Sequence, residues 1–252
     1  MSKQVNVIPQ SDQTSRTTRP RIVAGIPAYN EEQFIAKVVL KAREFTDEVI
    51  VVDDGSRDGT SEAAKAAGAV VINHGVHKGY GESIKSCFEV MKLNTADVLV
   101  VLDGDGQHDP DDIPRLLAPV LNREADVVVG SRFLGGQTNM PRYRKFGIKV
   151  ITFLCNFGSR VKVSDAQSGF RAYRKKVLDT LTISGSGMGA SAEVIMKIRE
   201  KGFSIKEVPI RCLYHSKGST LNPVIHGLGV AFTVVKLRFK GLLRRLIGGS
   251  GA

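Results

Sequence analysis

Apolar runs that end in turns rich in proline, glycine or acidic residues recur along the first half of this chain. The clearest of them cover residues 21–26, 48–54 and 98–102. A run of consecutive apolar residues is typical of a strand that is buried on both faces, as in the middle of a parallel sheet. Segments with helical periodicity follow the turns, for example at 33–45 and 80–91. This alternation predicts an α/β fold with a mostly parallel central sheet flanked by helices.

The rest of the chain predicts further elements of both kinds. We expect helices at 61–67, 110–122, 143–157, 177–181 and 191–201, and strands at 69–73, 126–130 and 204–213. The chain has 252 residues, of which 42% are hydrophobic, and this is enough for one large α/β domain. Its three cysteines lie far apart in the sequence, which argues against a disulfide framework or a zinc site.

The most acidic turn, Asp103 to Asp109, directly follows the apolar run at 98–102. Ligands of open α/β sheets bind at the carboxyl ends of the strands, where this turn is expected to lie. The carboxylates of Asp103 and Asp105 and the amide oxygen of Gln107 are hard oxygen ligands. They indicate a divalent cation that holds a diphosphate, and a simple solvated loop is the plain alternative.

The turns of this chain do not match two other well-known binding motifs. A calcium loop of the EF-hand type needs glycine where this chain has His108 and glutamate where it has Pro114. A nicotinamide-dinucleotide fold needs Gly-x-Gly-x-x-Gly after the first strand, whereas the sequence there is Gly25-Ile26-Pro27-Ala28-Tyr29-Asn30. Neither a calcium loop nor a dehydrogenase is therefore expected.

The positive charge is concentrated near the end of the chain. The formal net charge is +11, and residues 211–252 contribute seven Lys or Arg residues and no acidic residue. One basic face suits phosphates or an anionic membrane better than nucleic acid wrapped around the protein. The segments 143–157 and 225–247 mix apolar and basic residues, which is typical of helices that lie in the membrane interface. A core helix with a solvated basic face is the alternative.

Five short motifs follow one another along the chain. They are Ile26-Pro27-Ala28-Tyr29-Asn30-Glu31, Val52-Asp53-Asp54-Gly55-Ser56, Asp103-Gly104-Asp105-Gly106-Gln107-His108, Gly130-Ser131-Arg132 and Asp165-Ala166-Gln167-Ser168-Gly169-Phe170-Arg171. With these motifs the chain resembles glycosyltransferase family 2 from about Arg21 to Thr220. The resemblance is closest to the dolichol-phosphate or polyprenyl-phosphate sugar transferases. It implies the GT-A type of nucleotide-diphospho-sugar transferase fold, which is Rossmann-like.

The resemblance also implies which residues bind the donor, a nucleotide-diphosphate sugar. The implied contacts are Pro27, Ala28, Tyr29, Glu31, Asp54, Asp103, Gly104, Asp105, Arg132 and Lys217. Among them, Tyr29 and Glu31 would line the base and ribose, and Asp54 would accept hydrogen bonds from the base or sugar. Asp105 and Gln107 would ligate Mg²⁺ or Mn²⁺, which would bridge the diphosphate.

On the acceptor side, the resemblance implies roles for Ser168, Arg171 and Ser219. Arg132 and Asp165 would be the catalytic residues. A lipid phosphate has a second pKa of about 6 and is already largely ionised, so it needs no strong base, and Asp165 would then orient the acceptor or sugar. If the acceptor is a hydroxyl, Asp165 becomes the candidate base.

These implications predict an inverting, metal-dependent glycosyltransferase that moves a sugar from a GDP- or UDP-sugar to a polyprenyl or dolichyl phosphate. A family 2 enzyme that acts on a soluble saccharide or a protein hydroxyl is the alternative. Two alternatives from other functional classes are a sugar nucleotidyltransferase and a non-enzymatic adaptor for nucleic acid. We expect no nucleic-acid partner. The sequence does not indicate an oligomeric state.

The predicted organisation has three parts. Residues 1–20 are expected to be a disordered tail, 21–220 the glycosyltransferase domain, and 221–252 a basic amphipathic segment at the membrane surface. Because no signal peptide or spanning segment is recognised, we expect a cytoplasmic protein that is peripheral on the inner face of the cell membrane or an equivalent cytosolic leaflet.

Overall fold

The computed structural model describes residues 19–93, 95–135, 139–185, 187, 189–214, 229–230 and 233–236. The strands are β1 (Ile22–Ala28), β2 (Glu48–Asp53), β3 (Val70–Asn73), β4 (Val98–Val101), β5 (Val127–Ser131), β6 (Arg171–Arg174) and β7 (Ile205–Pro209). The helices are α1 (Glu32–Ala42), α2 (Thr60–Ala66), α3 (Tyr80–Leu93), α4 (Ile113–Leu121), α5 (Arg142–Asn156), α6 (Lys175–Leu178) and α7 (Ala190–Glu200), with a 3₁₀ turn, η1 (Pro110–Asp112), before α4.

The strands form one seven-stranded sheet in the order β3-β2-β1-β4-β6-β5-β7. Every neighbouring pair is parallel except the two pairs that involve β6, which is antiparallel to both β4 and β5. The predicted α/β fold with a mostly parallel sheet is confirmed. Strand β6 was not predicted, because Arg171-Ala-Tyr-Arg174 is short and half of it is arginine.

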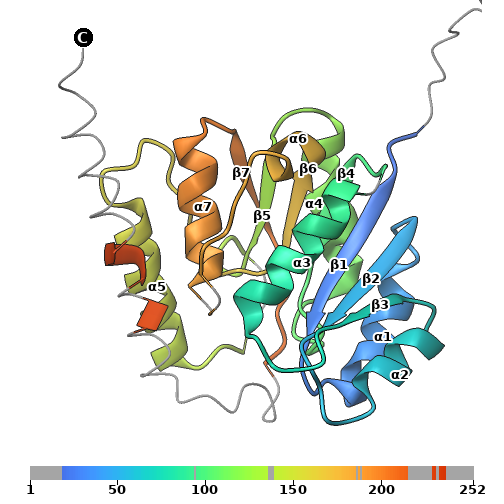
Figure 1. Cartoon of the computed structure of the whole chain (residues 1–252). Helices are drawn as coiled ribbons and strands as arrows, with labels where there is room; N and C mark the ends of the chain where they lie inside the picture. Colours follow the sequence, from blue (N-terminus) through green and yellow to red (C-terminus); the bar gives the residue numbers. More distant parts are fainter. Residues whose placement is uncertain are drawn as a thin grey trace, which may run out of the picture.

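Helices cover both faces of the sheet (Figure 1). Side chains of α1, α2 and α4 pack on one face in a core that includes Ile26, Val51 and Val100. Side chains of α3, α6 and α7 pack on the other face against Val52, Val101 and the neighbours of these residues. Adjacent residues of one strand therefore belong to opposite cores, which explains why the strands read as continuous apolar runs.

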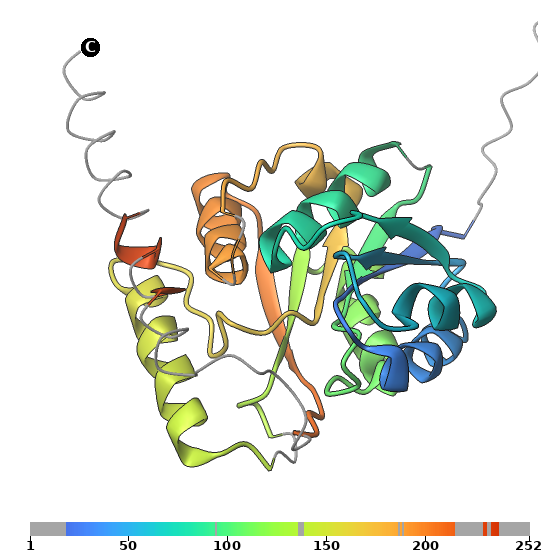
Figure 2. The ribbon, with the colours of Figure 1, turned by 60° about the horizontal axis from the view of Figure 1, so that its bottom comes forward.

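Helix α5 stands at the opposite end of the molecule from α1 and α2 (Figure 2). It contributes only Ile148, Ile151, Thr152 and Cys155 as buried residues. No helix in the part of the chain that the structure describes is both long and apolar enough to cross a membrane. Residues 1–18 of the predicted tail, nearly all of the predicted 221–252 segment, Lys217 and Ser219 lie outside the described residues.

Candidate functional site

One edge of the sheet collects the polar ends of five strands. Strands β1, β2, β4 and β5 run in the same direction, so their carboxyl ends lead into the segments that begin at Tyr29, Asp54, Leu102 and Arg132. Because β6 runs the other way, its amino end brings residues 165–170 to the same edge. Because β6 is antiparallel, the last of the five motifs lies at the same edge of the sheet as the other four.

Three carboxylates, those of Glu31, Asp103 and Asp105, form an acidic cluster at the ends of β1 and β4. Burial and the negative charges of Asp105 and Asp103, with a smaller effect of Asp58, raise the pKa of Glu31 to about 7. Burial contributes most to this rise, and the neighbouring carboxylates add to it because like charges disfavour the ionised form. A cation or a donor-rich ligand would relieve the repulsion.

Asp105 and Gln107 face each other within the acidic loop. The Gln107 side-chain amide donates to Asp105 Oδ2 at 2.7 Å, and the backbone N–H of Gln107 donates to Oδ1 at 3.0 Å. Among the described residues, no three His, Cys, Asp or Glu side chains are arranged to hold a metal ion by themselves. Mg²⁺ commonly takes one or two carboxylates and fills its shell with water and substrate phosphates, and the hard oxygens of this loop fit that pattern.

Asp103 lies between the acidic loop and the segment before β6. Its Oδ1 atom is buried and has no hydrogen-bond partner among the described residues. Burial raises the pKa of Asp103, while the Tyr80 hydroxyl and the charges of Arg132 and Arg171 act against the rise. A Cβ on Gly169 would lie 2.7 Å from the Tyr80 hydroxyl and 2.9 Å from both carboxylate oxygens. Only glycine therefore fits at position 169 without displacing Asp103.

Asp54 is held by four donors at the end of β2. Its side chain is 3% exposed. Oδ1 contacts His74 Nδ1 at 2.8 Å and accepts from the Lys78 N–H at 2.9 Å, while Oδ2 accepts from the Gly79 N–H at 2.7 Å and lies 2.8 Å from His77 Nδ1. Burial would raise the pKa of Asp54, but these hydrogen bonds outweigh burial and lower it. Asp54 is thus a fixed carboxylate beside Tyr29, whose ring stacks on His77.

Arg132 and Asp165 form a buried bidentate ion pair. Arg132 Nε donates to Asp165 Oδ2 at 2.6 Å and Nη2 donates to Oδ1 at 2.8 Å. Burial would raise the pKa of Asp165, but the Arg132 charge and its hydrogen bonds hold that pKa below the ordinary value. A fully buried carboxylate with a lowered pKa is a weak base.

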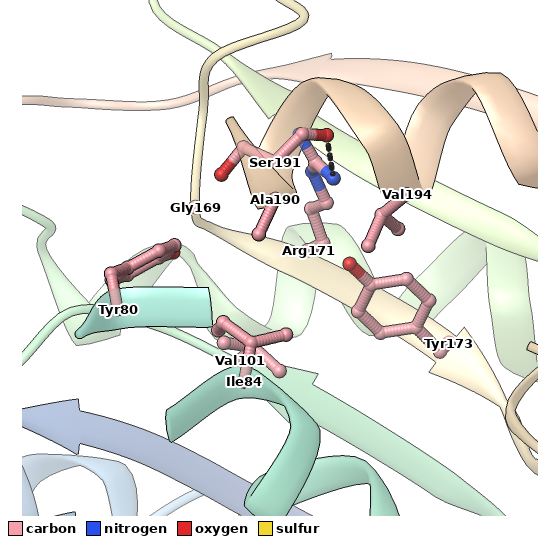
Figure 3. Close-up of a pocket in the computed structure, with 9 residues that line it drawn as sticks. All are labelled: Tyr80, Ile84, Val101, Gly169, Arg171, Tyr173, Ala190, Ser191 and Val194. Atoms are coloured by element: carbon pink, nitrogen blue, oxygen red, sulfur yellow. Dashed lines mark hydrogen bonds between the residues drawn. The ribbon is translucent and has the colours of Figure 1, made fainter. Parts of the chain in front are cut away.

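Ser168 and Arg171 are buried beneath the surface of this edge rather than exposed on it. Ser168 is fully buried and Arg171 is 2% exposed. The guanidinium of Arg171 donates to the carbonyl oxygens of Ser191 and Ala166, both at 2.9 Å, in a cavity that Tyr80 and Tyr173 also line (Figure 3). Their predicted contact with the acceptor stays a prediction, and the packing shown here ties the segment before β6 to the start of α7.

The chain matches the family model for glycosyl transferase family 2 over residues 24–182. It belongs to glycosyl transferase family 2. The matched region contains the acidic cluster, Asp54, Arg132 and Asp165. The chain is therefore a glycosyltransferase, and the sequence prediction of its family is confirmed.

Two relatives are sugar transferases named for lipid phosphates. The UDP-N-acetylglucosamine–dolichyl-phosphate N-acetylglucosaminyltransferase of Methanococcus voltae is 32% identical over 215 residues, covering 75% of this chain and 84% of that protein. The undecaprenyl-phosphate mannosyltransferase of Micrococcus luteus is 31% identical over 246 residues, covering 90% and 99%. The predicted resemblance to polyprenyl-phosphate sugar transferases is confirmed.

The fold also matches solved structures of the GT-A type. The glucosyl-3-phosphoglycerate synthase of Mycobacterium tuberculosis, crystallised with Mn²⁺, UDP-glucose and phosphoglyceric acid, superimposes with a TM-score of 0.68 at 23% identity. The match covers 86% of this chain and 79% of that chain. At this level of identity the similarity establishes the fold, and the predicted GT-A architecture of this family 2 enzyme is confirmed.

Several residues that shape this family 2 site were not singled out from the sequence. Glu207, on β7, accepts from the backbone N–H groups of Ser164 and Asp165 and so holds the Asp165 loop. The Tyr214 hydroxyl accepts from Arg132 Nη1 at 3.1 Å. Both come from the end of the domain, and no local signal in the sequence connects them to Arg132 or Asp165.

His108 supports the acidic loop from within the protein. Burial lowers its pKa to about 4, so the imidazole is neutral at physiological pH, and its Nδ1 accepts from the backbone N–H of Asp103 at 3.3 Å. Its ring packs on Phe170, and its backbone forms an isolated bridge with Cys212. Neutral His108 therefore joins the acidic loop to the segments before β6 and after β7.

Proposed function

We propose that this family 2 enzyme is an inverting, metal-dependent transferase that moves a sugar from a nucleotide diphosphate to a polyprenyl or dolichyl phosphate. The observation that carries the proposal is the acidic cluster of Glu31, Asp103 and Asp105 next to the Arg132–Asp165 pair. A divalent cation bound to a diphosphate suits both features. The cation would neutralise the carboxylates, and the Arg132 guanidinium would attract the phosphate charge.

The residues that would hold the ion are Asp105 and Gln107. When bound, Mg²⁺ or Mn²⁺ would act as a Lewis acid on the diphosphate. A phosphate oxygen of the acceptor attacks the anomeric carbon as the bond from that carbon to the diphosphate oxygen breaks, and the electron pair leaves with the nucleoside diphosphate. Attack from the side opposite the leaving group inverts the anomeric centre. Arg132, fixed in place by Asp165 and Tyr214, lies at the same edge to stabilise the developing charge.

The state of Asp165 supports a phosphate acceptor over a hydroxyl acceptor. A hydroxyl needs a group that removes its proton, and Asp165 has a lowered pKa and is committed to Arg132. An ionised phosphate needs no such base. The relatives named for dolichyl and undecaprenyl phosphate agree with this choice.

The outer face of α5 supports contact with a membrane surface, where a lipid phosphate would be found. Four exposed apolar side chains repeat at spacings of three or four residues, namely Tyr143 (60% exposed), Phe146 (70%), Val150 (41%) and Phe153 (65%). The helix also carries Arg142, Arg144, Lys145 and Lys149, and it has no acidic residue. An aromatic stripe flanked by cations is the pattern of a helix that lies in an anionic membrane interface.

The membrane contact is tested by replacing Phe146 and Phe153 with aspartate and measuring sedimentation with vesicles that contain anionic lipid. We expect the double variant to lose most of its vesicle binding. Leu93→Asp is the matched control, because Leu93 is 89% exposed on another helix and its change should leave binding intact. Equal binding of the two variants would contradict the membrane contact through α5.

The transfer itself is tested with purified protein, Mn²⁺, polyprenyl phosphate and a panel of labelled UDP- and GDP-sugars. We expect label in the organic phase with at least one donor and none when EDTA is present. Label that appears only in water-soluble products would instead indicate a saccharide or protein hydroxyl as the acceptor. Absence of transfer with every donor would contradict the proposal.

A further inference from the structure

The four partners of Asp54 are of two kinds. The backbone N–H groups of Lys78 and Gly79 and the imidazole of His74 are fixed parts of the fold. His74 is 6% exposed and its Nε2 contacts Ser86 Oγ at 2.9 Å. These three donors hold the carboxylate in one orientation and cannot leave without rebuilding the turn before α3.

His77, the fourth partner, differs from the other three in exposure. Its side chain is 54% exposed, although its Nδ1 atom is only 2.8 Å from Asp54 Oδ2. A contact made by an exposed side chain is weakened because water competes for that side chain, here the imidazole of His77. His77 can therefore leave Asp54 while the rest of the turn stays in place.

The position of the His77 ring is also distinctive. It lies on the ring of Tyr29, with 4.1 Å between the ring centroids and 34° between the ring planes. Tyr29 itself is 37% exposed at the end of β1. The imidazole of His77 is thus a flat heterocycle that rests on Tyr29 and places a ring nitrogen on the carboxylate of Asp54. A nucleobase bound here would make the same two contacts.

We propose that His77 occupies the nucleobase position in the donor-free protein and is displaced from Asp54 and Tyr29 when the nucleotide sugar binds. This inference rests on the proposed function and deepens it. The base would stack on Tyr29 and donate a ring N–H to Asp54 Oδ2 in place of His77. His77 is then a specificity-determining residue, because a base must replace its contacts to enter.

The fixed carboxylate of Asp54 determines which bases can replace His77. Uracil and guanine carry a ring N–H that can donate to Asp54. Adenine and cytosine present a ring nitrogen lone pair at the corresponding edge, which the carboxylate would repel. The site should therefore accept UDP or GDP and reject ADP and CDP.

The test is calorimetric titration of wild-type protein, His77→Ala and Val76→Ala with UDP, GDP, ADP and CDP in the presence of Mn²⁺. Because the exposed contact of His77 no longer has to be broken, His77→Ala should bind UDP or GDP about fivefold more tightly than wild type. Val76 is 64% exposed in the same turn, and its aliphatic side chain has neither a donor for Asp54 nor a ring to place on Tyr29, so Val76→Ala should bind as wild type does. Tyr29→Ala should bind about tenfold more weakly, since the base loses its stacking partner.

A second measurement reports on His77 directly. In wild-type protein, the imidazole NMR signals of His77 should shift when UDP or GDP is added, and those of His74 should stay. Equal or weaker nucleotide binding by His77→Ala, with unmoved His77 signals, would overturn the inference and leave the proposed function standing. If wild-type protein binds no nucleoside diphosphate at all, the proposed function fails and the inference fails with it.

Discussion

The acidic cluster and the Arg132–Asp165 pair lie at the same edge of one sheet, yet the protein treats their charges in opposite ways. In the pair, two full charges are buried and matched by a bidentate contact, which lowers the pKa of Asp165. In the acidic cluster, carboxylates lie near one another, and burial together with these like charges raises the pKa of Glu31 to about 7. The comparison teaches that matched charge builds the frame of the site, whereas accumulated like charge is available for a ligand.

The largest expected effect comes from breaking the pair. Asp165→Ala leaves the buried guanidinium of Arg132 without its carboxylate, and we expect a loss of about 3–5 kcal/mol in the free energy of unfolding. Urea denaturation measures the loss. The control is the double variant Arg132→Met with Asp165→Leu, which removes both charges and should recover most of the stability. A single variant within about 1 kcal/mol of wild type would show that the pair is not part of the frame.

Removing a charge from the acidic cluster should have the opposite outcome. With Asp105→Asn, kcat/KM for sugar transfer should fall by at least about 100-fold because the ion loses a ligand charge. The free energy of unfolding should not fall, since Glu31 loses a like charge nearby. Asp111→Asn is the matched control, because it removes the same charge from an exposed position just after the loop. An Asp105→Asn variant that is destabilised but still active would show that Asp105 belongs to the frame of the site rather than to its ligand-binding charges.

The smallest expected effect concerns Glu31 and depends on pH. Its folded-state pKa of about 7 lies above the ordinary value of 4.5, so the folded protein binds this proton more tightly than the unfolded chain does. Glu31 should therefore make wild-type protein lose stability as the pH rises from about 4.5 to 7.

Glu31→Gln removes this dependence. At pH 8 the variant should be more stable than wild type by about 1–2 kcal/mol, which allows for the partial exposure of the side chain. At pH 4 the two proteins should unfold alike. Thermal unfolding at both pH values checks the sign, and a variant that is less stable at pH 8 would show that Glu31 has a favourable partner in the folded protein.

Much of the fold was predictable because strand and helix signals are local. The predicted strand at 98–102 corresponds to β4 and the predicted helix at 143–157 to α5, each within one residue at either end. The predicted helix at 110–122 is divided into η1 and α4, where Asp109 accepts from the Asp111 N–H and caps the first turn. The helical segment therefore begins at the predicted residue 110, but its first turn is 3₁₀ rather than α-helical.

The part of the candidate site that β1, β2 and β4 carry was predictable, and the part before β6 was much less so. Glu31, Asp54 and Asp105 follow strands of the predicted parallel sheet, so their common edge follows from strand direction alone. Pro27 was expected just after the first strand, but β1 continues through it to Ala28. Asp165 and Gly169 reach that edge only because β6 runs antiparallel between β4 and β5. No periodic pattern in Arg171–Arg174 indicates this placement.

By itself, the sequence determined the family, the α/β class and the acidic loop, because each is carried by contiguous residues whose chemistry and spacing are local. The tertiary structure decided how charges from distant segments meet. It paired Arg132 with Asp165, placed Gly169 against Asp103, and brought His77 onto Tyr29 and Asp54. These contacts depend on strand order and on the path of two turns, which are set by packing of the whole sheet rather than by any one segment.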